Sequence, residues 1–195
     1  MGRLAGLDAV TIDAMGTLVR LRAPVPRLAE LGGVSEQAAK RGFEAEVAYY
    51  LPRAVEGHDP ESLADLRDRC TAVFNEAAGA SLGRDEFMSA IVFEPEPGAL
   101  ETVRRLRALG LALAVVSNWD CGLPEHLHRL GIDLPVVTSA EVGAAKPDPR
   151  IFLVALERLG VEPARALHVG DAPEDEHGAV AAGMGFAPAP LEALP

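Results

Sequence analysis

Ala9-Val10-Thr11-Ile12-Asp13-Ala14-Met15-Gly16-Thr17-Leu18 is the stretch that indicates the fold of this protein. Its first four residues form a short run, apolar and rich in β-branched side chains, and Asp13 follows directly. Such a run predicts a buried strand over 9–12 that ends at Asp13. Similar runs recur at 111–116, 134–137, 166–169 and 184–187. Because these runs do not alternate apolar and polar residues, they predict a parallel sheet covered on both faces.

Helical patterns lie between the later strands. From 97 to 109, leucine and valine recur at helical spacing, and Gly110 follows as a stop. A second helix is expected over 149–159 with Asp148 as its N-cap, and a third over 175–182. This alternation of strand and helix predicts an α/β fold with a doubly wound parallel sheet.

The segment 22–93 interrupts the alternation. It shows no strand pattern, and we expect helices over 35–51, from an Asp59 N-cap and Pro60 onward, and over 83–91. The run 94–98, with two prolines and a glycine, is typical of a stiff linker that leads back to the sheet. The sequence therefore predicts a Rossmann-like core of 1–21 and 94–195 with an inserted α-helical cap of 22–93.

Composition limits the classes of partner. The 195 residues carry 18 Lys and Arg against 29 Asp and Glu, so the net charge is −11, which argues against nucleic acids and anionic membranes as partners. No apolar run approaches the ~20 residues of a transmembrane helix, and the start of the chain does not resemble a signal peptide. The two cysteines, Cys70 and Cys121, lie far apart, which favours a reducing compartment and predicts a cytoplasmic location.

Polar residues follow each predicted strand where it ends. In an open parallel sheet, ligands bind beyond the carboxyl ends of the strands. The acids, hydroxyls, amide and lysine expected at this edge are Asp13, Thr17, Ser117, Asn118, Asp120, Lys146, Asp171 and Asp175. So many reactive groups at one edge favour a catalytic site over a set of ordinary polar loops.

Four short segments resemble the four motifs of the haloacid dehalogenase-like (HAD) hydrolase superfamily. They are Asp13-Ala-Met-Gly-Thr-Leu18, Val116-Ser117-Asn118, Lys146-Pro-Asp-Pro-Arg-Ile-Phe152 and His168-Val-Gly170-Asp171. Their order and spacing match the family, and the helical insert falls where that family places a small helical cap. The stretch 117–183 is also similar to a branch typified by a rhythmically expressed insect protein.

The resemblance implies a hydrolase that acts on a small phosphorylated molecule. It implies that Asp13 attacks the substrate and forms a covalent intermediate, which divides one difficult step into two. It implies Mg²⁺ held by Asp13, Asp171 and the main-chain carbonyl of Met15, since Mg²⁺ prefers oxygen ligands. Lys146 would neutralise the nucleophile and the transferring group. The phosphate oxygens would be held by Thr17, Ser117 and Asn118.

Two positions depart from the family pattern. Phosphatases of the family usually carry a second Asp where this chain has Met15, and losing a general acid typically costs ~10²–10⁴-fold in rate. Asp120 is the nearest substitute that the sequence offers. The fourth motif is one residue short, so its second acid is Asp175 or Glu176. We favour Asp175, because the packing of the following helix fixes its register while a loop can lose a residue.

Three functions stay open at this point. The first is a Mg²⁺-dependent phosphatase that forms an aspartyl-phosphate on Asp13, with activity reduced by Met15. The second is a 2-haloacid dehalogenase, which needs no metal and also lacks the second Asp, although those enzymes replace the acid found here at Asp171. The third is a binding protein that kept the fold and lost turnover. The sequence does not specify the substrate, because residues of the predicted cap would select it.

Overall fold

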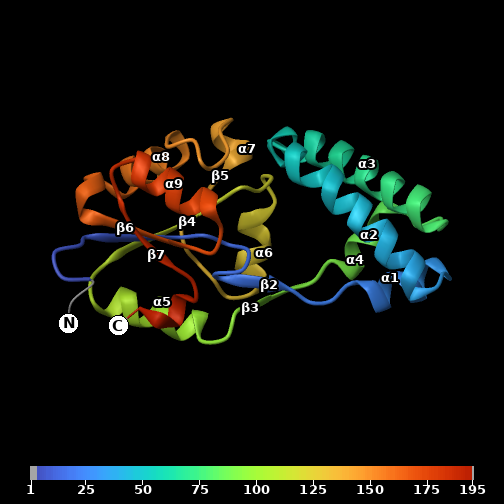
Figure 1. The fold of residues 1–195 in the computed structure, drawn as a ribbon, viewed down its shortest axis with the longest axis horizontal. Helices are drawn as coiled ribbons and strands as arrows, with labels where there is room; N and C mark the ends of the chain where they lie inside the picture. The colour runs from blue at the N-terminus through green and yellow to red at the C-terminus, as the bar shows by residue number, and fades with distance from the viewer. Residues whose placement is uncertain (1–3, 195) are drawn as a thin grey trace.

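Five parallel strands form the central sheet of the protein, in a computed structural model that describes residues 4–194. The strands are β1 (Ala9–Ile12), β4 (Ala112–Ser117), β5 (Val136–Thr138), β6 (Ala166–Gly170) and β7 (Gly185–Pro188). Their order in the sheet is β5-β4-β1-β6-β7, so the first strand of the chain lies at the centre (Figure 1). The chain adds strands to one side of β1 and then to the other, which places a switch in topology beside β1.

Helices cover both faces of this sheet. Val10 and Ile12 of β1 lie in one hydrophobic cluster with α5 (Ala99–Ala108) and α6 (Leu123–Arg129). Ala9 lies in the opposite cluster with α8 (Arg150–Leu159) and α9 (Pro173–Ala181). Neighbouring residues of a strand face opposite sides, so β1 contributes to both clusters. The structure confirms the predicted α/β class and the doubly wound parallel sheet.

All six predicted helices exist, and side-chain caps set the starts of two of them. Ser35 accepts a hydrogen bond from the Ala38 amide at the start of α2 (Glu36–Tyr50), and Asp59 caps α3 (Pro60–Ala78) in a capping box with Ser62. The prediction that Asp148 is the N-cap of α8 was wrong by one residue. Pro149 takes that position, and the Asp148 carboxylate accepts from the Arg150 amide at 2.9 Å.

A two-stranded antiparallel ribbon was not predicted. It pairs β2 (Val19–Leu21) with β3 (Phe93–Pro95), so part of the expected linker 94–98 is a strand. Three residues per strand are too few to show a sequence period. Six short helices and turns were also missed. They are α1 (Val25–Gly32), α6, α7 (Ser139–Val142) and the 3₁₀ turns Leu51–Glu56, Pro163–Arg165 and Leu191–Ala193.

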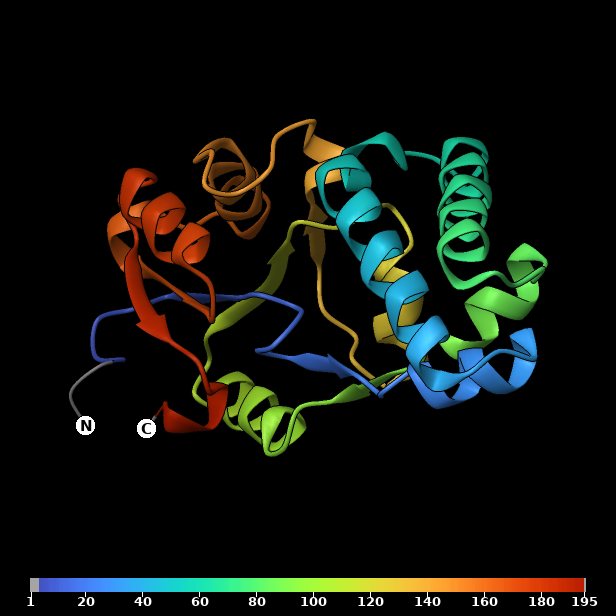
Figure 2. The same ribbon diagram turned by 45° about the vertical axis from the view of Figure 1, so that its right-hand side comes forward.

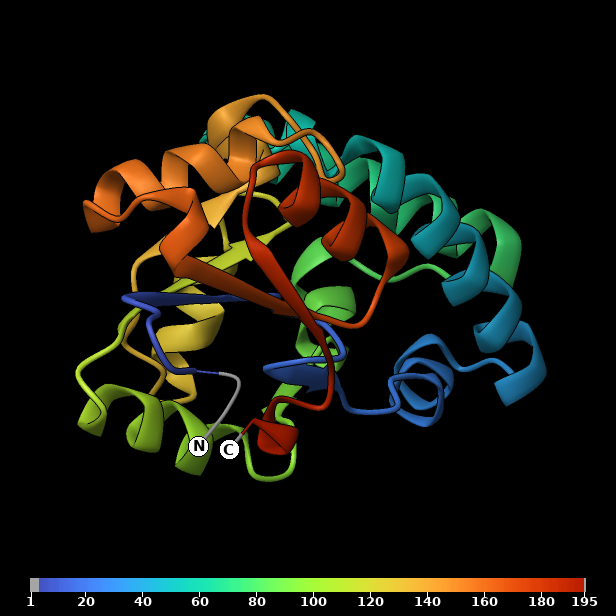
Figure 3. The same cartoon turned by 60° about the vertical axis from the view of Figure 1, so that its left-hand side comes forward.

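The helices between β2 and β3, here called the insert helices, are α1, α2, α3 and α4 (Arg84–Ala90). They enclose a hydrophobic cluster of their own, in which the rings of Phe74 and Phe87 lie 5.1 Å apart. Figure 2 shows them packed beside the sheet, and Figure 3 shows the sheet and its covering helices with the left-hand side of Figure 1 brought forward. The boundaries of a core of 1–21 and 94–195 and a cap of 22–93 stay a prediction. Within residues 4–194, no helix is both long enough and apolar enough to cross a bilayer.

Candidate active site

Three strand ends bring the central side chains of the site together. Asp13 follows β1, Ser117 ends β4, and Asp171 follows β6, and both β4 and β6 pair with β1 in parallel register. The Ser117 hydroxyl donates to Asp13 Oδ1 at 3.0 Å. Asp13 is only 5% exposed, so its carboxylate depends on the protein rather than on water for its hydrogen bonds.

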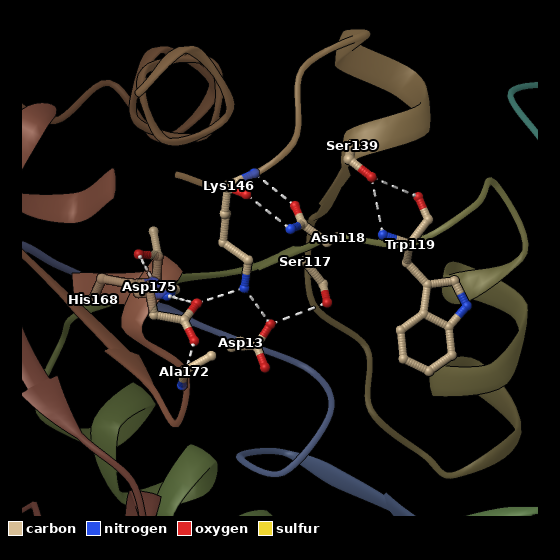
Figure 4. Close-up of polar contacts among 10 residues, drawn as sticks. Asp13, Ser117, Asn118, Trp119, Ser139, Lys146, His168, Ala172 and Asp175 are labelled. Carbon is tan, nitrogen blue, oxygen red and sulfur yellow. Dashed lines mark hydrogen bonds and ion pairs between the residues drawn. The ribbon is translucent and has the colours of Figure 1, made fainter. Parts of the chain in front are cut away.

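Lys146 bridges two buried carboxylates. Its Nζ lies 2.5 Å from Asp13 Oδ1 and 2.5 Å from Asp175 Oδ1 (Figure 4). Its main chain is held by Asn118, whose Oδ1 accepts from the Lys146 amide at 2.7 Å and whose Nδ2 donates to the Lys146 carbonyl at 3.1 Å. The amide group that was predicted to touch phosphate therefore fixes the position of the lysine.

The charges of this cluster determine its protonation. Burial lowers the pKa of the Lys146 ammonium, but the adjacent Asp13 and Asp175 outweigh burial and leave that pKa above its usual value. Burial raises the pKa of Asp175, but its hydrogen bonds with His168 and Lys146 hold that pKa well below the usual range. Burial raises the pKa of Asp13, and Lys146 opposes this effect. Lys146 is therefore ionised and lies between two acids, of which Asp175 is firmly ionised.

His168 is a part of the site that the sequence reasoning missed. It is fully buried on β6, opposite Thr11 of β1, and burial lowers the pKa of its imidazole. Its Nε2 lies 3.0 Å from Asp175 Oδ1, which can only accept, so Nε2 carries the proton and Nδ1 accepts from the Thr11 hydroxyl at 2.8 Å. A histidine inside an apolar strand was the available signal.

Asp175 is the acid of the fourth motif that enters the site. It is completely buried, and besides Lys146 and His168 it accepts from the Ala172 amide at 3.0 Å. Glu176 is exposed. A side chain at Gly170 would collide with the Asp175 carboxyl, so this strand end must carry glycine for the acid to fit.

Three carboxylates form a group suited to a hard divalent cation. One oxygen from each of Asp13, Asp171 and Asp175 lies within 4.8 Å of the others. Gly16, with φ of 77°, passes so close to Asp171 that any side chain there would collide with its carboxylate. An all-oxygen set of this kind fits Mg²⁺. The Met15 carbonyl as a further ligand stays a prediction.

Thr17 carries an unused polar atom beside this group. The residue is 1% exposed, and its Oγ1 is the buried side-chain polar atom without a hydrogen-bond partner in the part of the chain that the structure describes. Buried polar groups without partners are rare in folded proteins and call for a physical reason. A bound anionic oxygen would supply the missing partner.

Two further predicted residues lie on the wall of a cavity between the insert helices and the sheet. The Met15 side chain is 37% exposed and faces this cavity of about 400 Å³. Asp120 is 5% exposed, and its two oxygens accept from the Tyr50 hydroxyl at 2.8 Å and from the Gly122 amide at 2.7 Å. Tyr50 belongs to α2, so this bond joins the insert helices to the sheet.

A buried acid and lysine at the carboxyl edge of a Rossmann-like sheet, with helices inserted after the first strand, define the HAD class of hydrolases. The model of the haloacid dehalogenase-like hydrolase family matches residues 7–183. The chain belongs to this family.

Curated relatives place it in the predicted branch. Haloacid dehalogenase-like hydrolase domain-containing protein 3 of Bos taurus is 35% identical over 201 residues, which cover 91% of this chain and 80% of that protein. Rhythmically expressed gene 2 protein of Drosophila melanogaster is 33% identical, over 47% of this chain and 39% of that protein. Glyceraldehyde 3-phosphate phosphatase of Methanopyrus kandleri is 44% identical, over 47% of this chain and 41% of that protein. The last two matches thus span less than half of each relative.

Solved structures agree on the fold. A HAD phosphatase from Thermococcus onnurineus is 26% identical with a TM-score of 0.62, over 92% of this chain and 85% of that one. L-2-haloacid dehalogenase from Xanthobacter autotrophicus is 22% identical with a TM-score of 0.71, over 93% and 77%. The second likeness is one of fold alone. Together with the family match they confirm the predicted HAD-type architecture.

Proposed function

We propose that this protein is a Mg²⁺-dependent phosphatase that forms an aspartyl-phosphate on Asp13. The observation that carries the proposal is the cluster of three carboxylates from Asp13, Asp171 and Asp175. One oxygen of each lies within 4.8 Å of the others. Three acids so close together need a cation beyond Lys146, and a dehalogenase that uses no metal has no need of Asp171.

In the first step Asp13 is the nucleophile. Its Oδ1 is occupied by Ser117 and Lys146, while Oδ2 has no hydrogen bond from residues 4–194. Oδ2 forms the bond to phosphorus as the bond from phosphorus to the leaving oxygen breaks, and that oxygen keeps the electron pair. Lys146 opposes the effect of burial on the pKa of Asp13 and reduces the repulsion between the carboxylate and the phosphate. Thr17 Oγ1 donates to a phosphate oxygen.

Mg²⁺ held by Asp13, Asp171 and Asp175 would supply the positive charge that lets a dianionic phosphate approach these acids. In the second step water attacks phosphorus and the bond between phosphorus and Asp13 Oδ2 breaks. Inorganic phosphate leaves with one proton of that water, and the other proton goes to solvent, which balances the proton that the departed leaving oxygen takes from solvent. His168 and Thr11 act through Asp175, since they hold the carboxylate that positions Lys146.

Met15 limits which substrates react well. A thioether cannot give a proton to the departing oxygen, and Asp120 already accepts hydrogen bonds at both of its oxygens. Phosphates whose leaving groups are stable without a proton, such as aryl esters and acyl phosphates, are therefore the better substrates. Relatives named as phosphatases support this class of reaction.

A 2-haloacid dehalogenase is the second candidate, and Met15 is the observation that favours it. A halide leaves without a proton, so the missing acid would not slow the first step. In that reaction Asp13 Oδ2 displaces the halide at carbon, and water then hydrolyses the ester. Asp171 stands against this candidate, because the reaction gives it no role.

Turnover with and without metal separates the candidates. We expect hydrolysis of acetyl phosphate and p-nitrophenyl phosphate in Mg²⁺ that stops in excess EDTA, with no chloride released from 2-chloropropionate. Chloride release that is unaffected by EDTA, without phosphate turnover, would establish the dehalogenase instead. No turnover of either class by folded protein would leave a binding protein and reject both enzymes.

A further inference from the structure

The cavity between the insert helices and the sheet has a mainly apolar wall. One face of α2 contributes Phe43 and Val47, α4 and the residue after it contribute Met88 and Ile91, and the antiparallel ribbon contributes Leu21 and Phe93. Its volume of about 400 Å³ lies in the range of ~300–1,000 Å³ that is usual for small-molecule sites. The cavity is thus large enough for the organic part of a substrate.

This cavity adjoins the predicted nucleophile. Met15, on its wall, lies two residues after Asp13, and Asn118, also on its wall, follows the Ser117 that donates to Asp13. A phosphate held at Asp13 and Thr17 therefore has this space next to it. Whatever group the phosphate carries must lie against the wall described above.

Three polar side chains on the wall, those of Tyr50, Asn118 and Asp120, already have partners inside the protein. Tyr50 donates to Asp120 at 2.8 Å, and the Asn118 amide is bonded to the Lys146 main chain. Glu46 and Arg67, on α2 and α3, and the rings of His126 and Trp119 are the groups left to meet a polar substituent. A body with several hydroxyls would lose its hydrogen bonds to water here and recover few of them.

We infer that the substrate is a phosphate monoester whose leaving group is a largely apolar body, such as an aryl group; a cyclic alkyl group fits the same wall but leaves more slowly because Met15 cannot give it a proton. The inference rests on the proposed function and names the substrate class of the same site. Sugar phosphates are excluded as good substrates, because their hydroxyls have too few partners on this wall.

A matched pair of substrates tests the class. Cyclohexylmethyl phosphate and glucose 6-phosphate both release a primary alcohol attached to a six-membered ring, so they differ chiefly in hydroxyl groups. We expect kcat/KM to be at least about 10²-fold higher for cyclohexylmethyl phosphate, the discrimination that unpaired hydroxyls produce in an apolar site. Equal values, or a preference for glucose 6-phosphate, would overturn the inference.

A variant that fills the cavity tests whether the preference for an apolar leaving group depends on the cavity wall. Val47→Phe, with its larger ring inside the cavity, should lower kcat/KM for cyclohexylmethyl phosphate by about tenfold or more. Acetyl phosphate, too small to fill the cavity, should change by less than about twofold. Ala48→Phe, on the exposed side of the same helix, is the matched control. Equal losses on both substrates in folded Val47→Phe would overturn the assignment to the cavity.

Binding gives a readout that does not depend on turnover. Trp119 is the single tryptophan and lies on the cavity wall, so its fluorescence reports an occupant. Cyclohexylmethylphosphonate, which cannot be hydrolysed at its carbon–phosphorus bond, should change this signal in wild type and not in Val47→Phe. If acetyl phosphate is not hydrolysed but the phosphonate binds, the proposed phosphatase function is wrong and the inference that the cavity takes an apolar ligand is supported. If acetyl phosphate is hydrolysed but the phosphonate does not bind, only the substrate class fails.

Discussion

The site at the sheet edge and the cavity beside it are built in opposite ways. At the edge, Asp13, Lys146 and Asp175 are almost fully buried, and each is held by hydrogen bonds from more than one element. In the cavity, apolar side chains from α2, α4 and the ribbon enclose space with few free polar groups. The sheet edge holds charged groups in fixed positions, and the cavity provides space for the organic part of a substrate.

This difference separates the reaction from the choice of substrate. Asp13 and Asp171 directly follow parallel strands, so the backbone of the sheet sets their positions, while Lys146 lies in the loop after α7 and Asp175 lies in the first turn of α9. The cavity wall depends on how helices far apart in sequence pack together. Substitutions at the edge should therefore affect all substrates alike, while those in the cavity should affect substrates according to the body they carry.

Asp13→Asn should have the largest effect, because an amide is not a nucleophile. We expect kcat/KM to fall at least about 10⁴-fold for acetyl phosphate and for cyclohexylmethyl phosphate alike. Lys146 keeps its second partner, Asp175, so the variant should still fold. The measurement is steady-state turnover, with circular dichroism to check folding. Asp133→Asn, at an exposed carboxylate, is the control and should leave turnover unchanged. Substantial activity in folded Asp13→Asn would remove Asp13 from the reaction.

Glu46→Gln should stabilise the protein at high pH. Burial raises the pKa of Glu46 to about 7 from its ordinary 4.5, and the adjacent Cys70 thiol on α3 opposes this only in part. The folded state thus holds the proton more tightly than the unfolded state, so this group's contribution to stability is fully present below about pH 4.5 and is lost as pH rises through about 7. Between these pH values, the contribution of Glu46 to the free energy of unfolding falls by at most about 3 kcal/mol.

Urea unfolding at pH 5 and pH 8 measures this effect. The gain in the free energy of unfolding from Glu46→Gln should be large at pH 8 and small at pH 5. Glu44→Gln, on the exposed side of the same helix, should change little at either pH. A gain that is the same at both pH values would mean that Glu46 does not titrate in this range.

Met15→Asp should narrow the gap between good and poor leaving groups. In the native protein kcat/KM should be much higher for p-nitrophenyl phosphate than for cyclohexylmethyl phosphate, because Met15 cannot protonate the departing oxygen. The new acid should raise the value for the alkyl ester by up to about 10²-fold. Met15→Asn, which adds polarity without a transferable proton, controls for a change in binding. If the native protein already hydrolyses both esters equally well, another group supplies the proton.

The difference between the sheet edge and the cavity also explains which parts of the site the sequence predicts well. Asp13, Ser117 and Asp171 were found because each directly follows a short apolar run, and the parallel sheet brings those ends together. Asp175 was favoured over Glu176 from helix register, and the structure places Asp175 inside and Glu176 outside. His168 was missed, because its partners Thr11 and Asp175 become neighbours only when β1 and β6 pair.

The cavity was not predicted, and its residues explain why. Phe43 and Val47 have the spacing of an ordinary buried helix face, and nothing in that pattern shows that the face borders empty space. The ribbon that closes one side has three residues in each strand, too few to recognise. The Asn118 amide was assigned to the substrate, but it holds the Lys146 main chain, a contact that depends on the path of a loop 28 residues away.

Tyr50→Phe should give the smallest effect and test how the two regions are joined. Tyr50 is on α2, and its hydroxyl donates to Asp120, which follows β4. Removing it leaves one oxygen of a buried carboxylate without a partner, so we expect a loss of about 1–2 kcal/mol in the free energy of unfolding. Because the bond holds an insert helix against the sheet, KM for cyclohexylmethyl phosphate should rise several-fold and kcat/KM for acetyl phosphate should change less. Tyr49→Phe is the control, since the Tyr49 hydroxyl contacts Arg69 within the insert helices. Equal rises in KM for both variants would show that this bond is not what keeps the cavity closed.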